Sequence, residues 1–131
     1  MPETKPSLQL EMQELLLVGA GAVPGALLRW QLDLHLRDQN LVVNVLGAAL
    51  LGLLAGLPSA PRRQLLLGIG FCGSVTTFSS WMLAAMKHLS AGDWSAALGL
   101  IGLTLGLGLG AAAFGFWFAK FVMRRSSRSE Y

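Results

Sequence analysis

Three long stretches of this chain contain no Asp, Glu, Lys or Arg, and they limit what it can fold into. They cover 40–61, 64–86 and 94–119. A helix needs roughly 20 mostly apolar residues to cross a bilayer, and each stretch is that long. Only 13% of the residues are charged, about half of the share in an average soluble domain. A soluble protein of 131 residues could not cover three such segments, so the sequence predicts an all-α membrane protein.

A fourth apolar segment, 15–28, is shorter. A full-length span at this place includes Arg29 and Asp33 near one end. A long Arg side chain can lie along the helix and lift its charge to the interface, and Trp30 suits the headgroup level. The sequence therefore predicts one membrane domain over 1–131 with four transmembrane helices, at about 15–31, 41–57, 64–88 and 94–122, and a polar tail at 124–131.

Lys and Arg are distributed unevenly between the two predicted sides of the membrane. Four helices place both termini on one side, and seven basic residues belong to that side or to the connection between the second and third helices. They are Lys5, Arg62, Arg63, Lys120, Arg124, Arg125 and Arg128, whereas the three on the opposite side are Arg29, Arg37 and Lys87. Because cytoplasmic loops are enriched in Lys and Arg, both termini are predicted to be cytoplasmic, with the chain in the cell (plasma or inner) membrane.

Small residues recur at every fourth position in the second and fourth predicted helices. The two sets are Ala48, Gly52 and Gly56, and Gly102, Gly106 and Gly110. In lipid there is no hydrophobic drive between helices, so close approach of backbones supplies much of their association energy. The spacing fits tight packing within one subunit and an interface between subunits, and both interpretations stay open.

Residues 68–81 carry the most specific pattern in the chain, Gly-Ile-Gly-Phe-Cys-Gly-Ser-Val-Thr-Thr-Phe-Ser-Ser-Trp. Hydroxyl side chains occupy five of the seven positions 74–80, which makes a poor lipid-facing surface. Together with Gly70 and Gly73 they favour a helix that breaks in the membrane, a feature tolerated only inside protein or beside a wet cavity. Freed carbonyls at a break can hold a cation, and the next half-helix presents N–H groups to an anion. The alternative is a hydroxyl-rich packing face.

The order of these residues resembles the signature of the CrcB/Fluc fluoride channel family, a Gly-Phe-Cys-Gly-Gly-x-Thr-Thr-Phe-Ser-Thr-Phe run on a broken third helix. Gly70-Phe71-Cys72-Gly73 and Thr76-Thr77-Phe78-Ser79 match it as they stand. Two further motifs are similar to the family pattern: Gly25-Ala26-Leu27-Leu28-Arg29-Trp30 at the end of the first helix, and Asn44-Val45-Leu46-Gly47 with Gly52 in the second. The similarity covers nearly the whole chain, and the third-helix run is its specific part.

This resemblance implies a fluoride-selective channel subunit that exports cytoplasmic fluoride down its electrochemical gradient and so reduces fluoride toxicity. It implies an antiparallel dimer of oppositely inserted subunits, either a homodimer or a heterodimer, with pores along the interface. A structural sodium ion (Na+), which is not transported, would sit on the backbone carbonyls of Gly73 and Thr76. The fluoride pathway would involve Asn44, Phe78, Ser79, Ser80 and Trp81, with Arg29 as the basic residue at the helix end. The implied partners are fluoride and the lipid bilayer, and no nucleic acid.

These residue types suit a small, strongly hydrated anion. A selective path must replace the water around fluoride with hydrogen-bond donors, and an Asn amide offers two while each Ser or Thr hydroxyl offers one. An aromatic ring also presents a positive edge. A fixed Lys or Arg in the pore could trap the ion, and the middle of each predicted span has no cationic side chain. Taken alone, Asn44 fits a hydrogen bond between helices as well as a pore group.

The chain departs from the family pattern at four positions. Ser74 replaces the second glycine, Trp81 the second phenylalanine, Ala84 a usual acidic residue, and Thr104 an asparagine in the fourth helix. A subunit that inserts in both orientations should also have nearly balanced basic residues, and this one does not. These features suggest a non-conducting or one-pore partner subunit in a heterodimer with a second family member.

Two other functions compete with a fluoride channel. A small multidrug-type proton-coupled exporter needs a membrane-embedded carboxylate, but Asp33, Asp38 and Asp93 all fall in predicted loops or helix ends. A non-conducting scaffold held together by its small-residue faces is the second alternative. The sequence shows no nucleophile–base pair, metal-ligand cluster or phosphate-binding loop, so no catalytic role is predicted.

Overall fold

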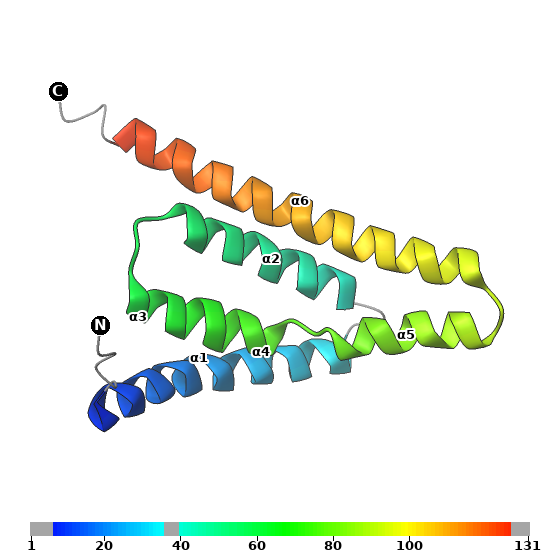
Figure 1. The fold of residues 1–131 in the computed structure, drawn as a ribbon, viewed down its shortest axis with the longest axis horizontal. Coiled ribbons are helices and arrows are strands. Elements are labelled where there is room, and N and C mark those ends of the chain that lie inside the picture. Colours follow the sequence, from blue (N-terminus) through cyan, green and yellow to red (C-terminus); the bar gives the residue numbers. More distant parts are fainter. Residues whose placement is uncertain (1–6, 36–39, 127–131) are drawn as a thin grey trace, which may run out of the picture.

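The computed structural model describes residues 7–35 and 40–126, and these residues are almost entirely helical (Figure 1). In chain order the helices are α1 (Leu8–His35), α2 (Asn40–Gly56), α3 (Pro61–Arg63), the π-helix η1 (Gln64–Cys72), α4 (Gly73–Val75), α5 (Ser79–Ser90) and α6 (Trp94–Ser126). The prediction of an all-α chain is confirmed. The four elements α3, η1, α4 and α5 form one run in place of the third predicted helix.

Three helical runs are long and apolar enough to cross a membrane: Leu8–His35, Pro61–Ser90 and Trp94–Ser126. The remaining helix, α2, is apolar but shorter, with 17 residues. Many large apolar side chains on these helices are exposed; Leu16 is 68% exposed and Leu109 is 72% exposed. Exposed apolar surface on this scale is typical of helices that face lipid, so the fold is that of a multi-pass membrane protein.

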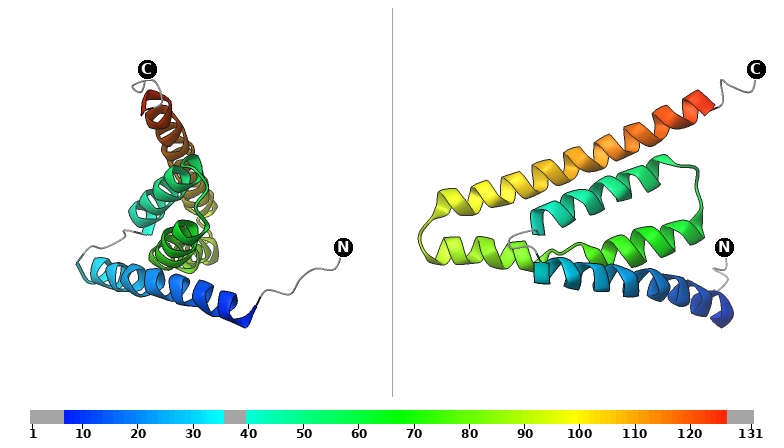
Figure 2. Two further views of the ribbon diagram at one scale, coloured as in Figure 1. Left: turned by 90° about the vertical axis from the view of Figure 1, so that its left-hand side faces the viewer. Right: turned by 180° about the vertical axis from the view of Figure 1, so that it is seen from behind.

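The helices run back and forth along the long axis of the molecule. α6 lies along α2, α2 lies beside the third helical run, and α1 covers another side of that run (Figure 1). Viewed from the end, α1 and α6 extend away from the centre in different directions (Figure 2). The start of α1, the end of α6 and the α2–α3 connection lie at one end of the molecule, and the α5–α6 connection lies at the other.

Close packing of these helices depends on glycines where two backbones nearly touch. A Cβ added at Gly52 of α2 would collide with the carbonyl oxygen of Ala112 on α6, and Gly115 on α6 meets the backbone of α2 in the same way. Gly21 on α1 faces the carbonyl of Leu66 on η1 equally closely. The small residues of α2 therefore serve packing within the subunit, one of the two interpretations left open by the sequence.

The glycines of α6 with the same spacing are in a different situation. Around Gly102, Gly106 and Gly110, an added Cβ would meet no atom within 4 Å among the described residues beyond its own stretch of helix. All three are exposed. This face of α6 is not used for packing within the described part of the chain, so an interface with a second subunit stays a prediction for it.

The first helix is longer than its charge pattern predicts. It begins at Leu8 and not at about 15, and it ends at His35 and not at 31. The Ser7 hydroxyl accepts a hydrogen bond from the amide of Leu10 at 3.3 Å, and Glu11 lies in the first turn, where a negative charge is favourable. Charged residues at the edge of an apolar stretch therefore do not end this helix. The loop predicted around 36–39 lies outside the described residues.

The last helix also continues past its predicted end. It reaches Ser126 and not about 122, so 124–126 are helical and not part of a tail. Arg124 and Arg125 occupy its last turn, where positive charge stabilises the C-terminal end of a helix. The rest of the predicted polar tail, 127–131, lies outside the described residues.

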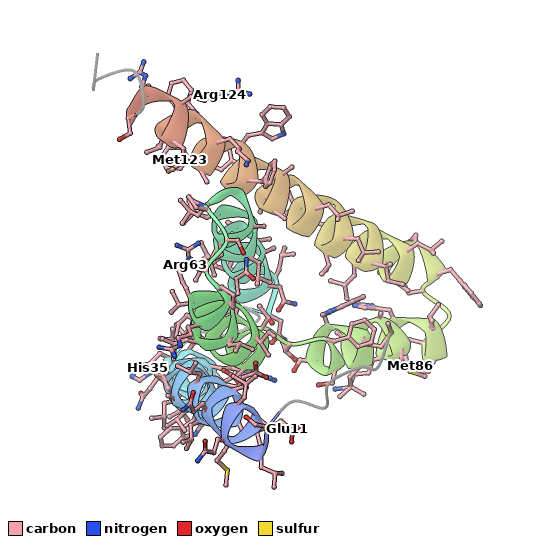
Figure 3. All side chains as sticks on the ribbon, turned by 60° about the vertical axis from the view of Figure 1, so that its left-hand side comes forward. Glu11, His35, Arg63, Met86, Met123 and Arg124 are labelled. Carbon is pink, nitrogen blue, oxygen red and sulfur yellow. The ribbon has the colours of Figure 1, made fainter. Side chains whose placement is uncertain are left out.

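Basic residues gather at the end of the molecule that holds the end of α6 and the α2–α3 connection. Those described there are Arg62, Arg63, Lys120, Arg124 and Arg125. Lys87 lies in the last turn of α5, next to the α5–α6 connection at the other end, and Arg29 lies beside Ser80 at the start of α5. Figure 3 shows Arg63 and Arg124 on one side of the view and Met86, the neighbour of Lys87, on the other. The three remaining basic residues, Lys5, Arg37 and Arg128, lie outside the described residues. Which end faces the cytoplasm stays a prediction.

Candidate functional site

The third helical run is interrupted at 76–78. Thr76 leaves the helix with φ −78° and ψ 159°, an extended conformation. Its own amide still donates to the carbonyl of Cys72 at 3.1 Å, and the first turn of the next helix is closed by the Met82 amide, which donates to the Phe78 carbonyl at 3.2 Å. Between these two hydrogen bonds, at 76–78, the backbone is not helical. The depth of this interruption in a bilayer stays a prediction.

The two glycines of this pattern both lie in helical segments before the interruption. Gly73 has helical angles, φ −63° and ψ −31°, and Gly70 is buried where α1 crosses η1. Gly70 is needed for another reason: a Cβ there would lie 2.5 Å from the carbonyl oxygen of Val18. The interruption begins at Thr76, within the run of glycines and hydroxyl residues that predicted a broken helix.

Asn44 on α2 holds the open backbone. Its Oδ1 accepts a hydrogen bond from the Thr77 amide at 2.8 Å, and its Nδ2 donates to the Thr77 carbonyl at 2.7 Å. The backbone fixes the orientation of this side-chain amide, because the N–H needs an acceptor and the C=O needs a donor. In a continuous helix the Thr77 amide would donate to the Gly73 carbonyl. Asn44 therefore replaces one helical hydrogen bond and keeps one N–H for another partner.

Thr77 and Ser80 form a small hydroxyl pair beside this clamp. Thr77, only 6% exposed, donates from Oγ1 to Ser80 Oγ at 3.0 Å and accepts from the Ser80 amide at 3.3 Å. Arg29 reaches across from α1 and donates from Nη2 to Ser80 Oγ at 3.1 Å. The sequence assigned Arg29 only a place at the end of a helix, so this contact between α1 and α5 is new.

Two other hydroxyls bond back to their own helical turn. Thr76 Oγ1 donates to the Cys72 carbonyl at 2.7 Å, and Ser74 Oγ lies within hydrogen-bond distance of the Gly70 carbonyl at 2.8 Å and the Phe71 carbonyl at 3.0 Å. Back-bonding of this kind occurs in ordinary helices as well. It uses the protons of these side chains, so Ser74 and Thr76 do not offer a hydroxyl donor in this conformation.

The two aromatic residues of the pattern are in contact but differ in exposure. The rings of Phe78 and Trp81 lie 5.0 Å apart between centroids with an interplanar angle of 80°, an edge-to-face pair. Phe78 is 67% exposed and Trp81 only 7%. Within this subunit Trp81 is thus a core residue of α5, while Phe78 presents its ring to the surface beside Ser79, which is also exposed.

Glycines from two other motifs surround the interruption. A Cβ at Gly47, three residues after Asn44, would collide with Thr76 Cγ2, and a Cβ at Gly25 would collide with Ser74 Oγ. The structure therefore brings the three motifs, which are far apart in the sequence, to one place. Gly73 itself is exposed and has open space around its Cα.

Sequence reasoning missed the central role of Thr77, whose backbone bonds to Asn44 and whose side chain bonds to Ser80. The available signal was Asn44, a polar side chain inside an uncharged helix. Its partner is the backbone of Thr77, and a backbone partner has no residue-specific pattern in the sequence. Thr104 is 7% exposed, and its Oγ1 has no hydrogen-bond partner among the described residues. Among these residues no three His, Cys, Asp or Glu side chains form a metal-binding group.

Comparison with known proteins places this arrangement in a family. Residues 16–116 match the family described as "CrcB-like protein, Camphor Resistance (CrcB)". "Fluoride-specific ion channel FluC 2" of Synechococcus sp. (strain CC9605) is 88% identical over 116 residues, which are 88% of each chain. The protein of the same name from Parasynechococcus marenigrum (strain WH8102) is 81% identical over the same length and the same shares.

A more distant relative has the other numbered name. A "Fluoride-specific ion channel FluC 1" of Prochlorococcus marinus is 40% identical over 110 residues, 84% of this chain and 85% of the relative. The family match over 16–116 extends from α1 into α6 and includes all three motifs that meet at the interruption. The relatives are named as ion channels and not as enzymes. The resemblance seen in the sequence is therefore confirmed, and the chain belongs to the CrcB family.

Proposed function

We propose that this chain is a fluoride channel subunit that exports cytoplasmic fluoride down its electrochemical gradient. The observation that carries the proposal is the interruption at 76–78, where an amide, hydroxyls and an exposed aromatic ring gather at an opened backbone. The names of the relatives supply the ion. Membership of the CrcB family leaves the multidrug-type exporter without support.

The chemistry of the site suits an anion that must lose its water. The remaining N–H of Asn44, the hydroxyl of Ser80 and the positive edge of the Phe78 ring are donors of the kind that can replace hydration. None of these groups carries a full charge, so fluoride would bind without being trapped. Ser79, exposed next to Phe78, adds a further hydroxyl to the proposed path. Trp81 supports Phe78 from within the subunit.

The Na+ site is a further part of the proposal. The Gly73 carbonyl no longer accepts the helical hydrogen bond from the Thr77 amide, because that amide donates to Asn44. The backbone of Thr76 is extended, so the Thr76 carbonyl does not point along the helix axis. Carbonyl oxygens of this kind fit a hard cation. One subunit would supply the Gly73 and Thr76 carbonyls to the ion, and the same two carbonyls of a second subunit would complete its coordination. A bound ion would supply positive charge beside the anion path.

The proposed assembly is a dimer of oppositely inserted subunits. Phe78 and the glycine face of α6 are exposed in the single subunit, and a partner would cover them. A heterodimer with a second family member is the finer proposal, because the described basic residues favour one end of the molecule. Relatives with the names FluC 1 and FluC 2 provide candidates for the two roles. In that case this chain would be the one-pore or non-conducting partner.

Fluoride efflux from liposomes tests the proposed function. The purified chain is reconstituted alone and together with a relative named FluC 1, and release of internal fluoride is followed with an ion-selective electrode after a potassium ionophore is added. We expect fluoride release and no chloride release from at least one preparation. Empty liposomes are the control. Release of both ions at equal rates, or of neither ion from both preparations, would contradict a fluoride-selective channel.

The same assay separates the two assemblies. Full activity of the chain alone supports a homodimer and excludes an obligatory heterodimer. Activity that requires the second family member supports the heterodimer. Replacing external sodium with a large organic cation then tests the Na+ proposal: slower fluoride release without sodium is expected, and an unchanged rate after prolonged removal of sodium would contradict it.

A further inference from the structure

Arg29 makes a contact that a helix-end anchor does not need. Its Nη2 donates to Ser80 Oγ on α5, 51 positions further along the chain, at 3.1 Å. Its other neighbour is Asp33 on its own helix, with 3.9 Å between Nε and Oδ2 and with 31% and 52% of the two side chains exposed. An exposed pair at that distance contributes little to stability. The hydrogen bond to Ser80 is therefore the specific interaction of this guanidinium.

The hydrogen bonds around Ser80 Oγ can be counted. A hydroxyl has two acceptor lone pairs and one proton to donate. One lone pair accepts from Arg29 and the other accepts from Thr77 Oγ1 at 3.0 Å. Both acceptor positions are then occupied, and the proton of Ser80 is the remaining hydrogen-bonding function of this side chain.

The direction of the bond between the two hydroxyls follows from burial. Thr77 is 6% exposed, and its Oγ1 already accepts from the Ser80 amide. If Ser80 donated to Thr77, the proton of Thr77 would be left without a partner in a buried position, which is unfavourable. Donation from Thr77 to Ser80 avoids this.

We infer that Arg29 is a positioning residue that fixes the Ser80 hydroxyl as a one-way hydrogen-bond donor to the permeating anion. The inference rests on the proposed function. A hydroxyl with free lone pairs can turn and accept from water or face a cation. With both lone pairs occupied, Ser80 can only donate, and donation from a charged neighbour strengthens its own O–H as a donor. Arg29 thus makes Ser80 a hydrogen-bond donor that binds anions, while the guanidinium itself belongs to α1 and is not the group that contacts the ion.

A double-mutant cycle tests this coupling. Fluoride efflux is measured for wild type, Arg29→Met, Ser80→Ala and the double variant, reconstituted in the preparation that conducts. Each single substitution is expected to slow fluoride efflux about tenfold, the size of one hydrogen bond to the ion. The double variant is expected to be no slower than the singles, because Arg29 has nothing to position once the hydroxyl is gone. Arg62→Met, which removes an exposed arginine at the other end of the molecule, should keep the wild-type rate.

Other results would overturn the inference. Multiplied effects in the double variant would mean that Arg29 acts through its charge and not through Ser80. A wild-type rate for Arg29→Met would remove Arg29 from the path, while fluoride release by the wild type would leave the proposed function standing. A wild type that releases no fluoride in either preparation would overturn the proposed function and this inference with it.

A second substitution covers the case in which Arg29→Met does not fold. Arg29→Lys keeps the charge and most of the stem but loses the planar fork. In the same cycle it should slow efflux in the wild-type background and have no effect in the Ser80→Ala background. An equal effect of Arg29→Lys in both backgrounds would contradict the inference. Size-exclusion profiles of all variants show whether any loss comes from misassembly.

Discussion

At the scale of single residues, Asn44 explains most of the local geometry. One side-chain amide replaces the helical partner of the Thr77 amide and also occupies the Thr77 carbonyl, with distances of 2.8 and 2.7 Å. A buried backbone group without a partner costs about 1–3 kcal/mol, so the interruption is stable only where such an amide faces it. The same residue keeps one N–H, which makes the structural and the proposed functional roles compatible.

Asn44→Asp changes the hydrogen-bonding groups and the charge of this side chain but hardly changes its size. The carboxylate is nearly isosteric and can still accept from the Thr77 amide, but it cannot donate to the Thr77 carbonyl. We expect a loss of thermal stability of about 1–3 kcal/mol and at least about tenfold slower fluoride efflux, because a negative charge would repel the anion. Asn40→Asp, at the first residue of α2, is the matched control. Unchanged efflux for Asn44→Asp would take Asn44 out of the pathway.

Asp93 determines how α6 begins. Its Oδ1 accepts from the Ala96 amide at 3.1 Å and from the Ser95 hydroxyl at 3.0 Å, which is typical of an N-cap. The backbone hydrogen bond from Ala96 and then the hydrogen bond from Ser95 lower the pKa of this carboxyl. Because the pKa is lower in the folded state, the stabilisation is present above the ordinary pKa of Asp and is lost as the pH falls through the lowered value.

Asp93→Ala should therefore lower the melting temperature of the detergent-solubilised protein at neutral pH. The difference from wild type should shrink at acid pH, as Asp93 becomes protonated in the folded as well as in the unfolded state. Asp93→Asn, which keeps an acceptor oxygen, should lower the melting temperature less than Asp93→Ala does at neutral pH. A deficit of Asp93→Ala that is the same at both pH values would rule out the capping carboxylate as its cause.

At the scale of helices, the packing surfaces differ more than their sequences suggest. Both α2 and α6 have small residues four positions apart, yet Gly52 touches a backbone carbonyl while Gly106 has open space around it. The third helical run contains a second unusual feature: its η1 segment has π-helical hydrogen bonding over nine residues. π-Helical hydrogen bonding is rare and occurs mostly as single turns inside α-helices, frequently at functional sites; η1 ends shortly before the interruption.

Gly52→Ala and Gly106→Ala form a matched pair of substitutions. The new methyl group at Gly52 would collide with the carbonyl of Ala112, so α2 and α6 must separate, with a loss of about 1–3 kcal/mol. At Gly106 it meets nothing within 4 Å among the described residues beyond its own stretch of helix, and alanine favours a helix by up to about 1 kcal/mol. Thermal unfolding in detergent measures both changes. Similar losses would show that the α6 face is packed after all, for example against a second subunit.

At the scale of the whole molecule, the uneven charge distribution makes a prediction about orientation. Ser59 in the α2–α3 connection and Ser90 at the end of α5 are exposed and lie at opposite ends. In cells, Ser90→Cys should react with a membrane-impermeant maleimide added outside, and Ser59→Cys should react only after permeabilisation.

The native protein is a suitable control for this labelling, because its single cysteine, Cys72, is fully buried. Equal labelling of both variants from outside would show that the subunit inserts in both orientations, which would favour the homodimer. Labelling of Ser59→Cys alone from outside would place the termini outside the cell and contradict the predicted topology.

The sequence by itself determined the helical class, the membrane character and the family, because apolar length, missing charge and the order of motif residues are local properties of the chain. It indicated an interrupted helix somewhere within 70–80, and the structure has the interruption at 76–78. Only the tertiary structure decided that position, because a helix opens where another helix supplies better partners for its backbone, and Asn44 does so for Thr77. The contact of Arg29 with Ser80 was hidden for the same reason: it joins residues that only the packing of α1 against the third helical run brings together.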